Sequence, residues 1–247
     1  MDRLVYTALS GLRGQMQAQA SIANNIANAS TIGYRTDRTT FDRLLLKGQP
    51  FESRQLSSEE VTDADRRAGA VTTTGRDLDV AVDGDAWIAV QARDGSEAYT
   101  RRGDLQVAPS GVLETGDGFP VMGSGGPITV PPYDKLSIAA DGTISIVPQG
   151  GDPTQPQELD KIKLASTAGS TTVKGLDNLL HVQGGGVLPD DMDAKVQSGA
   201  VEQSNVNLTQ ALVDMISNQR AYEVQTNLLK EAKSIDESGA SLMRLPG

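Results

Sequence analysis

Apolar residues recur with helical spacing at both ends of the chain, and this pattern predicts a long amphipathic helix at each end. Near the start, the apolar stripe consists of Val5, Leu9, Leu12, Met16, Ala23 and Ile26. Near the finish, it consists of Leu208, Leu212, Met215, Tyr222 and Leu229. A spacing of about 3.5 residues keeps side chains on one face of a helix. We therefore expect each terminal helix to pack against another helix.

Each predicted helix carries a second apolar row beside the first. In the first helix, expected over residues 3–29, this row holds Leu4, Ala8, Gly11, Ala18, Ile22 and Ala29. In the last helix it holds Ala221, Val224, Leu228, Ala232, Ile235 and Leu242. Two rows predict burial on more than one side, as in a bundle or the wall of a tube. Mid-helix glycines cost about 1 kcal/mol each relative to Ala, so Gly11 and Gly14 predict a first helix that forms only by packing.

Between the helical regions the apolar pattern changes to alternation, which predicts β-strands. The run 78–82 alternates, and Asp83-Gly84-Asp85 then has the composition of a tight turn. Further apolar runs predict strands at 86–90, 98–101, 105–108, 119–122, 128–130, 136–139, 143–147, 162–166 and 179–182, with a loop at 148–156. Short strands joined by tight turns are typical of an antiparallel sandwich or barrel.

Together these patterns predict an α+β fold in which the N- and C-terminal amphipathic helices form a coiled-coil-like domain beside a central antiparallel β domain. The expected segments are a first helix at 1–33, a connector at 34–76 that is partly helical near 38–46, the β domain at 77–200 and a last helix at 201–247. The first helix should stop between Asn28 and Gly33, because Asn and Gly tolerate left-handed backbone angles. The last should begin at Ser204-Asn205-Val206-Asn207, whose side chains can cap free N–H groups.

The charge is uneven along a chain whose net charge is −10. Residues 1–47 carry six basic and three acidic residues, 48–200 carry 12 and 23, and 201–247 carry four and six. Because an acidic body repels phosphate backbones, we expect no nucleic-acid partner. No stretch approaches the roughly 20 apolar residues of a membrane span, and no basic segment with a continuous apolar run marks a signal peptide. We expect a protein that is not membrane-embedded and carries no cleaved signal peptide.

Candidate catalytic residues each have a simpler structural interpretation. The single histidine, His181, lies in the strand-like run 179–182, and Asp83 and Asp85 flank a turn glycine. The acidic run Asp190-Asp191-Met192-Asp193 lacks the ligand spacing of a calcium loop. The absence of cysteine excludes thiol catalysis and cysteine-based zinc sites. We expect no catalytic, cofactor-binding or metal site; the alternative from another class is a secreted hydrolase that uses Asp carboxylates.

Three blocks of sequence, in order along the chain, resemble a known family. The first is Ile22-Ala23-Asn24-Asn25-Ile26-Ala27-Asn28-Ala29-Ser30-Thr31-Ile32-Gly33-Tyr34-Arg35. The second contains Leu78-Asp79-Val80-Ala81-Val82-Asp83-Gly84 and Ala98-Tyr99-Thr100-Arg101-Arg102-Gly103. The third contains Ser204-Asn205-Val206-Asn207, Met215-Ile216 and Gln219-Arg220-Ala221-Tyr222-Glu223. Together they resemble the bacterial flagellar rod and hook proteins over nearly the whole chain.

The resemblance implies a non-enzymatic structural subunit of the flagellar basal-body rod that helps to transmit motor torque to the hook. It implies partners among other rod proteins and copies of the same chain, export through the flagellar type III apparatus, and a place in the rod that crosses the periplasm. The opening residues 1–8 and Trp87-Ile88-Ala89-Val90 resemble the proximal-rod branch. A distal-rod or hook-family subunit is the alternative.

Assembly is then the function, and we predict that its interface lies on the first apolar stripes. The predicted interface residues are Val5, Leu9, Leu12, Met16, Ile26, Leu208, Leu212, Met215, Tyr222 and Leu229. Asn24, Asn25 and Asn28 are also candidates, because side-chain hydrogen bonds can fix the register of packed helices. The alternative is that these asparagines only cap and fray the end of the helix.

Overall fold

The computed structural model describes residues 2–45 and 55–243, with side chains described for residues 8–38 and, except for Asp236, 64–238. The chain divides into two compact units. A helical unit comprises Met1–Ala27, Asp37–Thr62 and Asn207–Gly247. A β unit comprises Asn28–Thr36 and Asp63–Val206. The chain therefore crosses between the units four times, and these divisions differ from the expected segments 1–33, 34–76, 77–200 and 201–247.

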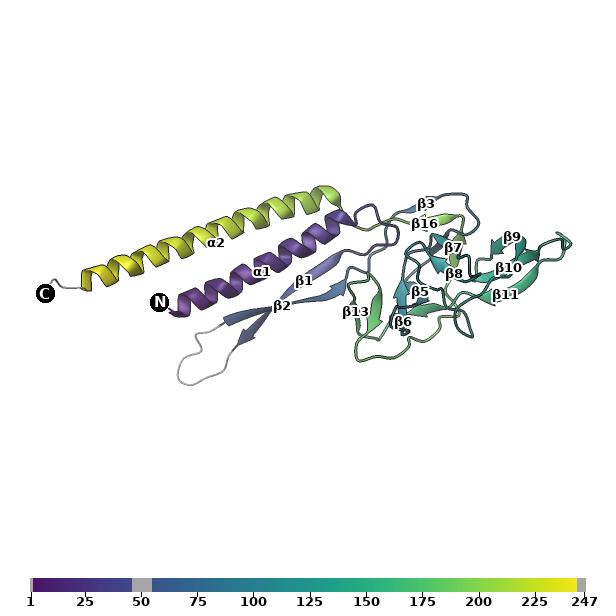
Figure 1. The fold of residues 1–247 in the computed structure, drawn as a ribbon, viewed down its shortest axis with the longest axis horizontal. Helices are drawn as coiled ribbons and strands as arrows, with labels where there is room; N and C mark the ends of the chain where they lie inside the picture. The colour runs from purple at the N-terminus through teal and green to yellow at the C-terminus, as the bar shows by residue number, and fades with distance from the viewer. Residues whose placement is uncertain (1, 46–54, 244–247) are drawn as a thin grey trace. The chain divides into compact units, whose positions relative to one another are not determined.

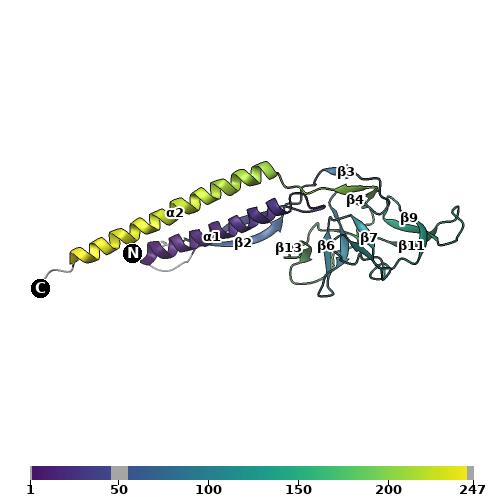
Figure 2. The ribbon, with the colours of Figure 1, turned by 45° about the horizontal axis from the view of Figure 1, so that its top comes forward.

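The helical unit contains the two terminal helices and one hairpin. Helix α1 spans Asp2–Ala27 and helix α2 spans Leu208–Met243; they are in contact and lie side by side (Figures 1 and 2). Strands β1 (Asp37–Leu45) and β2 (Gln55–Ala64) pair in a two-stranded sheet. Neither described helix is long and apolar enough to cross a membrane.

The prediction of partial helix near 38–46 is wrong, because residues 37–45 form strand β1. This segment contains Thr39-Thr40-Phe41, and β-branched and aromatic residues favour strands. Strand β2 supplies the partner for the backbone of β1. That partner begins ten residues after β1 ends, beyond the reach of a local pattern.

The β unit consists of several small sheets whose paired strands are antiparallel. The largest has the order β12 (Leu164–Ser166), β5 (Ala86–Gln91), β6 (Glu97–Thr100), β14 (Leu180–Val182) and β13 (Thr172–Lys174). A second has the order β11 (Gln157–Lys161), β10 (Thr143–Pro148) and β9 (Tyr133–Ile138). The remaining pairs are β15 (Val196–Ser198) with β4 (Val80–Val82), β16 (Ala200–Glu202) with β3 (Val71–Thr73), and β7 (Leu105–Val107) with β8 (Leu113–Thr115).

Strand β5 is buried on both faces and separates two apolar clusters. Ile88 and Val90 belong to the larger cluster, whereas Trp87 and Ala89 belong to a smaller one on the other face. The larger cluster also includes Leu105, Leu113, Ile128, Leu136, Ile144, Ile162 and Val196. Successive side chains of a strand point to opposite faces, so a run of apolar residues at 86–90 serves both clusters. The α+β class and the central antiparallel β domain are therefore as predicted.

Eight predicted strands are confirmed within one to three residues at each end, and two are wrong. Residues 119–122 and 128–130 form only isolated bridges, such as Val90–Val121 and Val112–Thr129. Pro120 and Pro127 cannot donate to a ladder, which limits strand pairing there. Several of the strands that local pattern missed, among them β3, β13 and β16, are only three residues long. The predicted loop at 148–156 is confirmed between β10 and β11.

Candidate assembly site

Two neighbouring asparagines tie the end of α1 to strand β1. Asn25 is 6% exposed; its Oδ1 accepts from Asp37 N at 2.8 Å, and its Nδ2 donates to Asp37 O at 3.2 Å. Asn24 Nδ2 donates to Asp37 Oδ2 at 2.7 Å. The Asn25 amide therefore pairs with the main chain of β1 much as a neighbouring strand would. These bonds position the hairpin on the helix, a role that the sequence did not suggest.

Helix α1 stops where the sequence predicts, and Gly33 explains part of the motif that follows. Thr31 N and Thr31 Oγ1 donate to Asn28 O and Asn28 Oδ1, at 3.1 Å and 3.2 Å, which closes a turn. Gly33 has φ +69°, in the left-handed region that favours glycine. A Cβ at Gly33 would lie 2.3 Å from the carbonyl carbon of Arg101. Only glycine permits both this angle and this close approach.

Three segments of the β unit are bound together immediately beyond this turn, and we call them the terminal clamp. The terminal clamp consists of residues 33–36, 65–69 and 202–205. Gly33 N donates to Glu202 O at 2.7 Å, and Asp65 N donates to Thr36 O at 2.8 Å. The first and third segments lie next to the residues that lead to and from the terminal helices in sequence. The clamp thus holds together, within the β unit, the two ends of chain to which the helices are attached.

Asn205 cross-links the clamp through both polar atoms of its side chain. Its Oδ1 accepts from Thr36 N at 2.8 Å and from Thr36 Oγ1 at 2.7 Å. Its Nδ2 donates to Asp65 O at 3.0 Å and to Arg67 O at 2.8 Å. This side chain therefore satisfies main-chain groups in two segments that are distant in sequence.

The sequence motif Ser204-Asn205-Val206-Asn207 thus divides between two roles. The predicted helix cap is confirmed at Asn207, whose Oδ1 accepts from Gln210 N at 3.1 Å in the first turn of α2. The expectation that Asn205 caps the helix is wrong, because its hydrogen bonds lie within the β unit. Local sequence cannot separate the two roles, since Asn suits caps and long-range cross-links equally.

A buried ion cluster occupies the centre of the clamp. The Glu202 carboxylate is 1% exposed, with Oε1 at 2.5 Å from Arg35 Nη1 and Oε2 at 3.1 Å from Arg101 Nη1. Gly69 N also donates to Glu202 Oε1, at 2.6 Å. Both guanidiniums are 2% exposed, so pairing with the carboxylate offsets part of their desolvation. Removal of that carboxylate would leave two buried positive charges.

The ring of Trp87 contacts both guanidiniums of the cluster. Its centroid lies 5.6 Å from Arg35 Cζ and 5.3 Å from Arg101 Cζ. Arg35 Nε and Nη2 and Arg101 Nε have no hydrogen-bond acceptor among the described residues, so cation–π contact is their compensation. Burial lowers the pKa of the Arg101 guanidinium, and the Glu202 carboxylate opposes that shift. The single tryptophan is therefore an internal reporter of the clamp.

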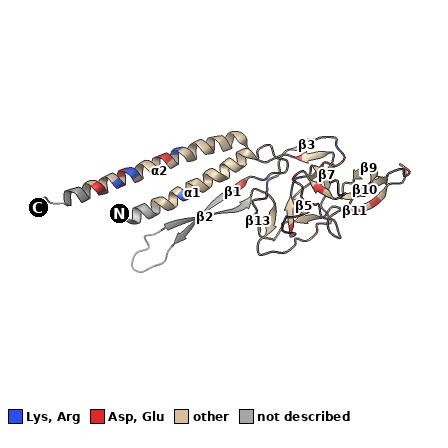
Figure 3. Cartoon of the chain, in the orientation of Figure 1, with Lys and Arg blue, Asp and Glu red and all other residues tan. Residues whose placement is uncertain are grey.

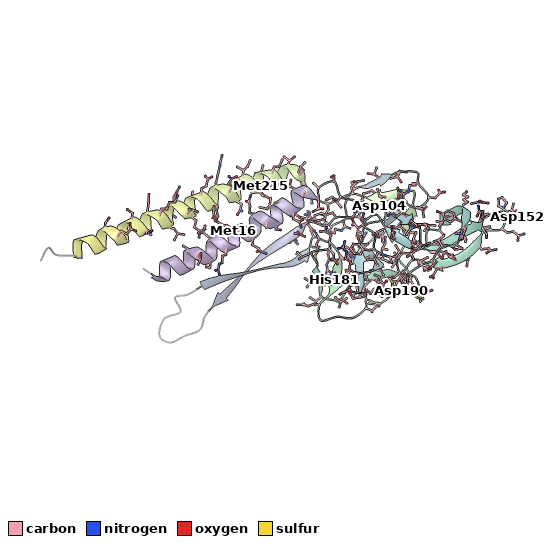
Figure 4. All side chains as sticks on the ribbon, viewed as in Figure 1. Met16, Asp104, Asp152, His181, Asp190 and Met215 are labelled. Atoms are coloured by element: carbon pink, nitrogen blue, oxygen red, sulfur yellow. The ribbon has the colours of Figure 1, made fainter. Side chains whose placement is uncertain are left out.

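Apart from the buried Asn25, the predicted interface residues on the two helices and at the end of α1 divide into exposed and half-buried sets. Met16 is 61% exposed, and the other exposed members are Leu9, Asn24, Leu208, Leu212 and Tyr222. The half-buried members are Leu12, Ile26, Asn28, Met215 and Leu229. Met16 on α1 and Met215 on α2 are labelled in Figure 4. The side chain of Val5 lies outside the described residues. The chain's own α1–α2 contact therefore covers only part of the predicted interface.

The second apolar row of α2 also remains uncovered. Val224, Leu228 and Ile235 are 60%, 61% and 66% exposed. Beside them lies an apolar groove of about 750 Å³, lined by Ala8, Ala221, Val224, Leu228, Leu229 and Ala232, with Arg220 and Gln225 as its polar members. Charges are scarce along α1, where Arg13 is the only charged residue between positions 8 and 27 (Figure 3). Apolar surface of this extent on two helices is typical of an interaction surface.

The remaining polar groups have structural roles in the described part of the chain. His181 lies on β14, as predicted, with Nε2 at 3.1 Å from Asp177 Oδ2. Asp83 Oδ1 accepts from Gly84 N at 2.9 Å in the turn between β4 and β5. Among the described residues, no group of three or more acidic or histidine side chains is suited to hold a metal ion. No arrangement here supports the carboxylate-hydrolase alternative.

Sequence reasoning missed two sets of residues, although weak signals existed for both. Glu202 ends the otherwise apolar strand β16, and a single carboxylate in an apolar run indicates a buried partner. Asn218 and Gln225 are seven residues apart, and both contact α1. Seven residues make two helical turns, so this spacing places both amides on one face of α2. Arg101 gave no signal, because only the fold brings it to Glu202.

Three flagellar families match successive parts of the chain. "Flagella basal body rod protein" matches residues 5–35, which end on the Tyr34-Arg35 pair of the clamp. "Flagellar hook protein FlgE/F/G D1 domain" matches residues 81–146 of the β unit. "Flagellar basal body rod FlgEFG protein C-terminal" matches residues 197–242, which include Glu202 and most of α2. The matched parts therefore include most of the first clamp segment, all of the third and most of both terminal helices, whereas the clamp segment 65–69 lies outside them.

Relatives align over nearly the full length of the chain. The basal-body rod protein FlgF of Salmonella typhimurium is 38% identical over 244 residues, or 96% of each chain. FlgF of Escherichia coli K12 is 38% identical over 251 residues, or 99% of this chain and 98% of the relative. This chain belongs to the flagellar basal-body rod protein family and is a structural rod subunit. Within the family it is close to FlgF, since the FlgG protein of Bacillus subtilis, which it covers fully, is 29% identical.

Proposed function

We propose that this rod subunit assembles through its terminal helices, which pack against the helices of neighbouring rod subunits in a coiled-coil-like layer. The observation that carries this proposal is the exposure of large apolar side chains on both helices. These side chains are Leu9, Met16, Leu208, Leu212, Val213, Ile216, Val224, Leu228 and Ile235. Each fully buried side chain of this kind contributes about 1.5–3 kcal/mol. Several such contacts per subunit suffice to order the helices in an assembly.

The exposed side chains on α2 lie on two flanks, which indicates more than one neighbour. Leu212 and Leu228 are 16 residues apart, and at about 100° per residue they point about 160° apart around the helix. The groove beside Leu228 accepts one helix, and Leu212 with Ile216 requires another. A surface of this kind that pairs head to tail, without closing on itself, generates a helical filament. The partners are other rod proteins and further copies of this chain.

We extend the proposal to the route and place of assembly on the basis of family membership. The subunit passes through the flagellar type III export apparatus without a cleaved signal peptide and takes its place in the proximal part of the rod, where it crosses the periplasm. There it helps to transmit motor torque to the hook and catalyses no reaction. The small, apolar and weakly charged face of α1 supports close packing of helices around the rod axis.

Replacement of one exposed apolar residue tests the interface directly. Leu228→Asp should abolish incorporation into isolated basal bodies and stop swimming, whereas its exposed neighbour Asn227→Asp should retain both. Leu212→Asp tests the second flank in the same way, and Leu12→Asp is a weaker test because Leu12 is half-buried within the chain. Trp87 fluorescence should show a folded β unit in each variant. Normal incorporation of both Leu228→Asp and Leu212→Asp would overturn the proposed interface.

Hydrogen exchange on the purified chain tests whether the helices depend on neighbours. We expect exchange to be faster over residues 2–27 and 208–243 than across 77–182, because isolated helices without apolar burial are marginal in water. Addition of preassembled rods should then protect the helical residues. Equal protection throughout the free chain would show that the helices are already stable alone, and assembly would need another driving force.

A further inference from the structure

Side-chain amides form hydrogen bonds between α1 and α2, among half-buried apolar residues such as Leu12 and Leu229. Asn218 Nδ2 donates to Gln15 O at 2.9 Å and to Gln19 Oε1 at 2.8 Å. One heptad further along α2, Gln225 Nε2 donates to Ala8 O at 3.0 Å. The contact between the helices is thus partly polar, whereas the sequence pattern alone predicts an apolar seam. We call Gln15, Gln19, Asn218 and Gln225 the amide seam.

The hydrogen bonds of the amide seam repeat with the same spacing on both helices. The donors Asn218 and Gln225 are seven residues apart on α2, and the acceptors Gln15 O and Ala8 O are seven residues apart on α1, in the opposite order. Seven residues make two helical turns, so both bonds lie on one face. Both bonds therefore specify the same antiparallel alignment, in which residue 15 lies opposite 218 and residue 8 opposite 225.

Glycine on α1 makes room for the seam at one of these positions. A Cβ at Gly11 would lie 2.4 Å from Gln225 Nε2, so a side chain at this position would displace the Gln225 amide from its present place. Gly14 is buried on the same helix. Gly11 thus has a positive role that offsets its low helix propensity. It lets the amide of Gln225 reach the main chain of α1.

Amides and apolar side chains differ in what a shift of alignment does to them. Apolar contacts tolerate a slide of one turn, because one apolar side chain replaces another, whereas a buried amide loses its hydrogen bonds. The seam also destabilises the pair in one place, since the buried Gln15 Oε1 has no hydrogen-bond donor among the described residues. Polar groups at a helix interface that lower stability while selecting one register are known from coiled coils. The same logic applies here.

We propose that Asn218 and Gln225, with Gly11, determine the register of the α1–α2 pair and so decide which apolar side chains face neighbouring subunits. A slide of one turn would move Met16 and Leu9 about 6 Å relative to Leu212 and Leu228. The same apolar side chains would then form a different surface toward neighbouring subunits. The choice of register is independent of the proposed function, whereas its consequence for assembly rests on it.

Engineered disulfides test the register, because the chain has no cysteine of its own. The pair Ile22→Cys/Ala211→Cys continues the observed alignment by one heptad, and Ala18→Cys/Ala211→Cys reports an alignment shifted by one turn. In the otherwise unchanged chain we expect the first pair to oxidise roughly tenfold more than the second. Asn218→Leu/Gln225→Leu should reduce this preference to about twofold or less. The exposed positions Gln219→Leu/Asn227→Leu provide a matched control that should keep it.

The preference between registers distinguishes this role from a merely structural one. A structural role would change total cross-linking or helix content, measured by circular dichroism, but would leave the ratio of the two disulfides unchanged. An unchanged ratio in the Leu variant, or no preference in the unsubstituted background, would overturn the proposal. Swimming of cells that carry the Leu variant is scored separately. If Leu228→Asp keeps the preference between the two disulfides but loses swimming, the proposed function is supported whatever the Leu variant shows. The register proposal and the assembly proposal can therefore fail independently.

Discussion

The β unit and the helical unit place polar and apolar groups in opposite ways. In the β unit, large apolar side chains such as Ile88, Leu113 and Ile144 are fully buried, and its buried charges are paired. In the helical unit, side-chain amides form hydrogen bonds between the helices, and apolar side chains such as Met16 and Leu228 are exposed. The β unit thus completes its own core, whereas the helical unit leaves apolar side chains exposed, and these are the side chains that we propose contact other subunits. The terminal clamp fixes, within the β unit, the two segments of chain that lead to and from the helices.

The largest expected effect comes from the centre of the clamp. Glu202→Ala should lower the free energy of unfolding of the β unit by about 3–5 kcal/mol, because two buried guanidiniums lose their counter-charge. Urea denaturation followed by Trp87 fluorescence measures the loss. The exposed Glu223→Ala on α2 is the control and should change stability by no more than about 0.5 kcal/mol. Similar values for both variants would mean that the β unit does not depend on its ion cluster.

A pair of leucines sharpens the contrast between the two units. Leu113→Ala should destabilise the β unit by about 2–5 kcal/mol, because it leaves a cavity in a fully buried site. Leu228→Ala should change the stability of the free chain by no more than about 0.5 kcal/mol. In cells, Leu228→Ala should reduce incorporation into the rod more than Leu113→Ala does, because Leu228 is proposed to contact neighbouring subunits. A large loss of stability in free Leu228→Ala would show that α2 is already packed on both flanks.

Two glycines with similar backbone angles distinguish the cost of a left-handed backbone from the cost of a close steric contact. Gly75 has φ +74° with nothing within 4 Å of an added Cβ, whereas Gly33 has φ +69° and abuts Arg101. Gly75→Ala should cost about 1–2 kcal/mol from the backbone angle alone. Gly33→Ala should cost roughly 1–3 kcal/mol more, since the added methyl group overpacks the clamp. Thermal unfolding monitored at Trp87 measures both, and equal losses would contradict the close approach at Gly33.

The smallest expected effect is confined to the start of α2. Asn207→Ala removes the side chain that accepts from Gln210 N and should weaken the first turn of α2 by about 1 kcal/mol. Amide exchange in residues 208–211 should accelerate while exchange in the β unit stays unchanged. Asn227→Ala, in the middle of the same helix, should not accelerate exchange in that turn. Acceleration throughout the β unit would show instead that Asn207 contributes to the clamp.

Local pattern in the sequence determined the helices, most of the central strands and the motifs that carry family membership. The 3.5-residue spacing around Leu9 and Leu212 and the alternation around Val80 each arise within one element, so they can be read without knowledge of the fold. The same holds for the helix stop at Asn28 and the cap at Asn207, where local backbone chemistry decides. The division of the chain into an α+β fold follows from these periods alone.

Only the tertiary structure decided which side chains meet. Arg35 and Glu202 are 167 residues apart, and strand β1 pairs with a strand that no local period around β1 indicates. The periodic stripe predicted that α2 has an apolar face, but it did not predict what that face contacts. The amides of Asn218 and Gln225 form hydrogen bonds to α1, while Leu212 and Leu228 stay exposed. A period fixes the direction of side chains around one element; what covers each face depends on packing and hydrogen bonds between elements distant in sequence.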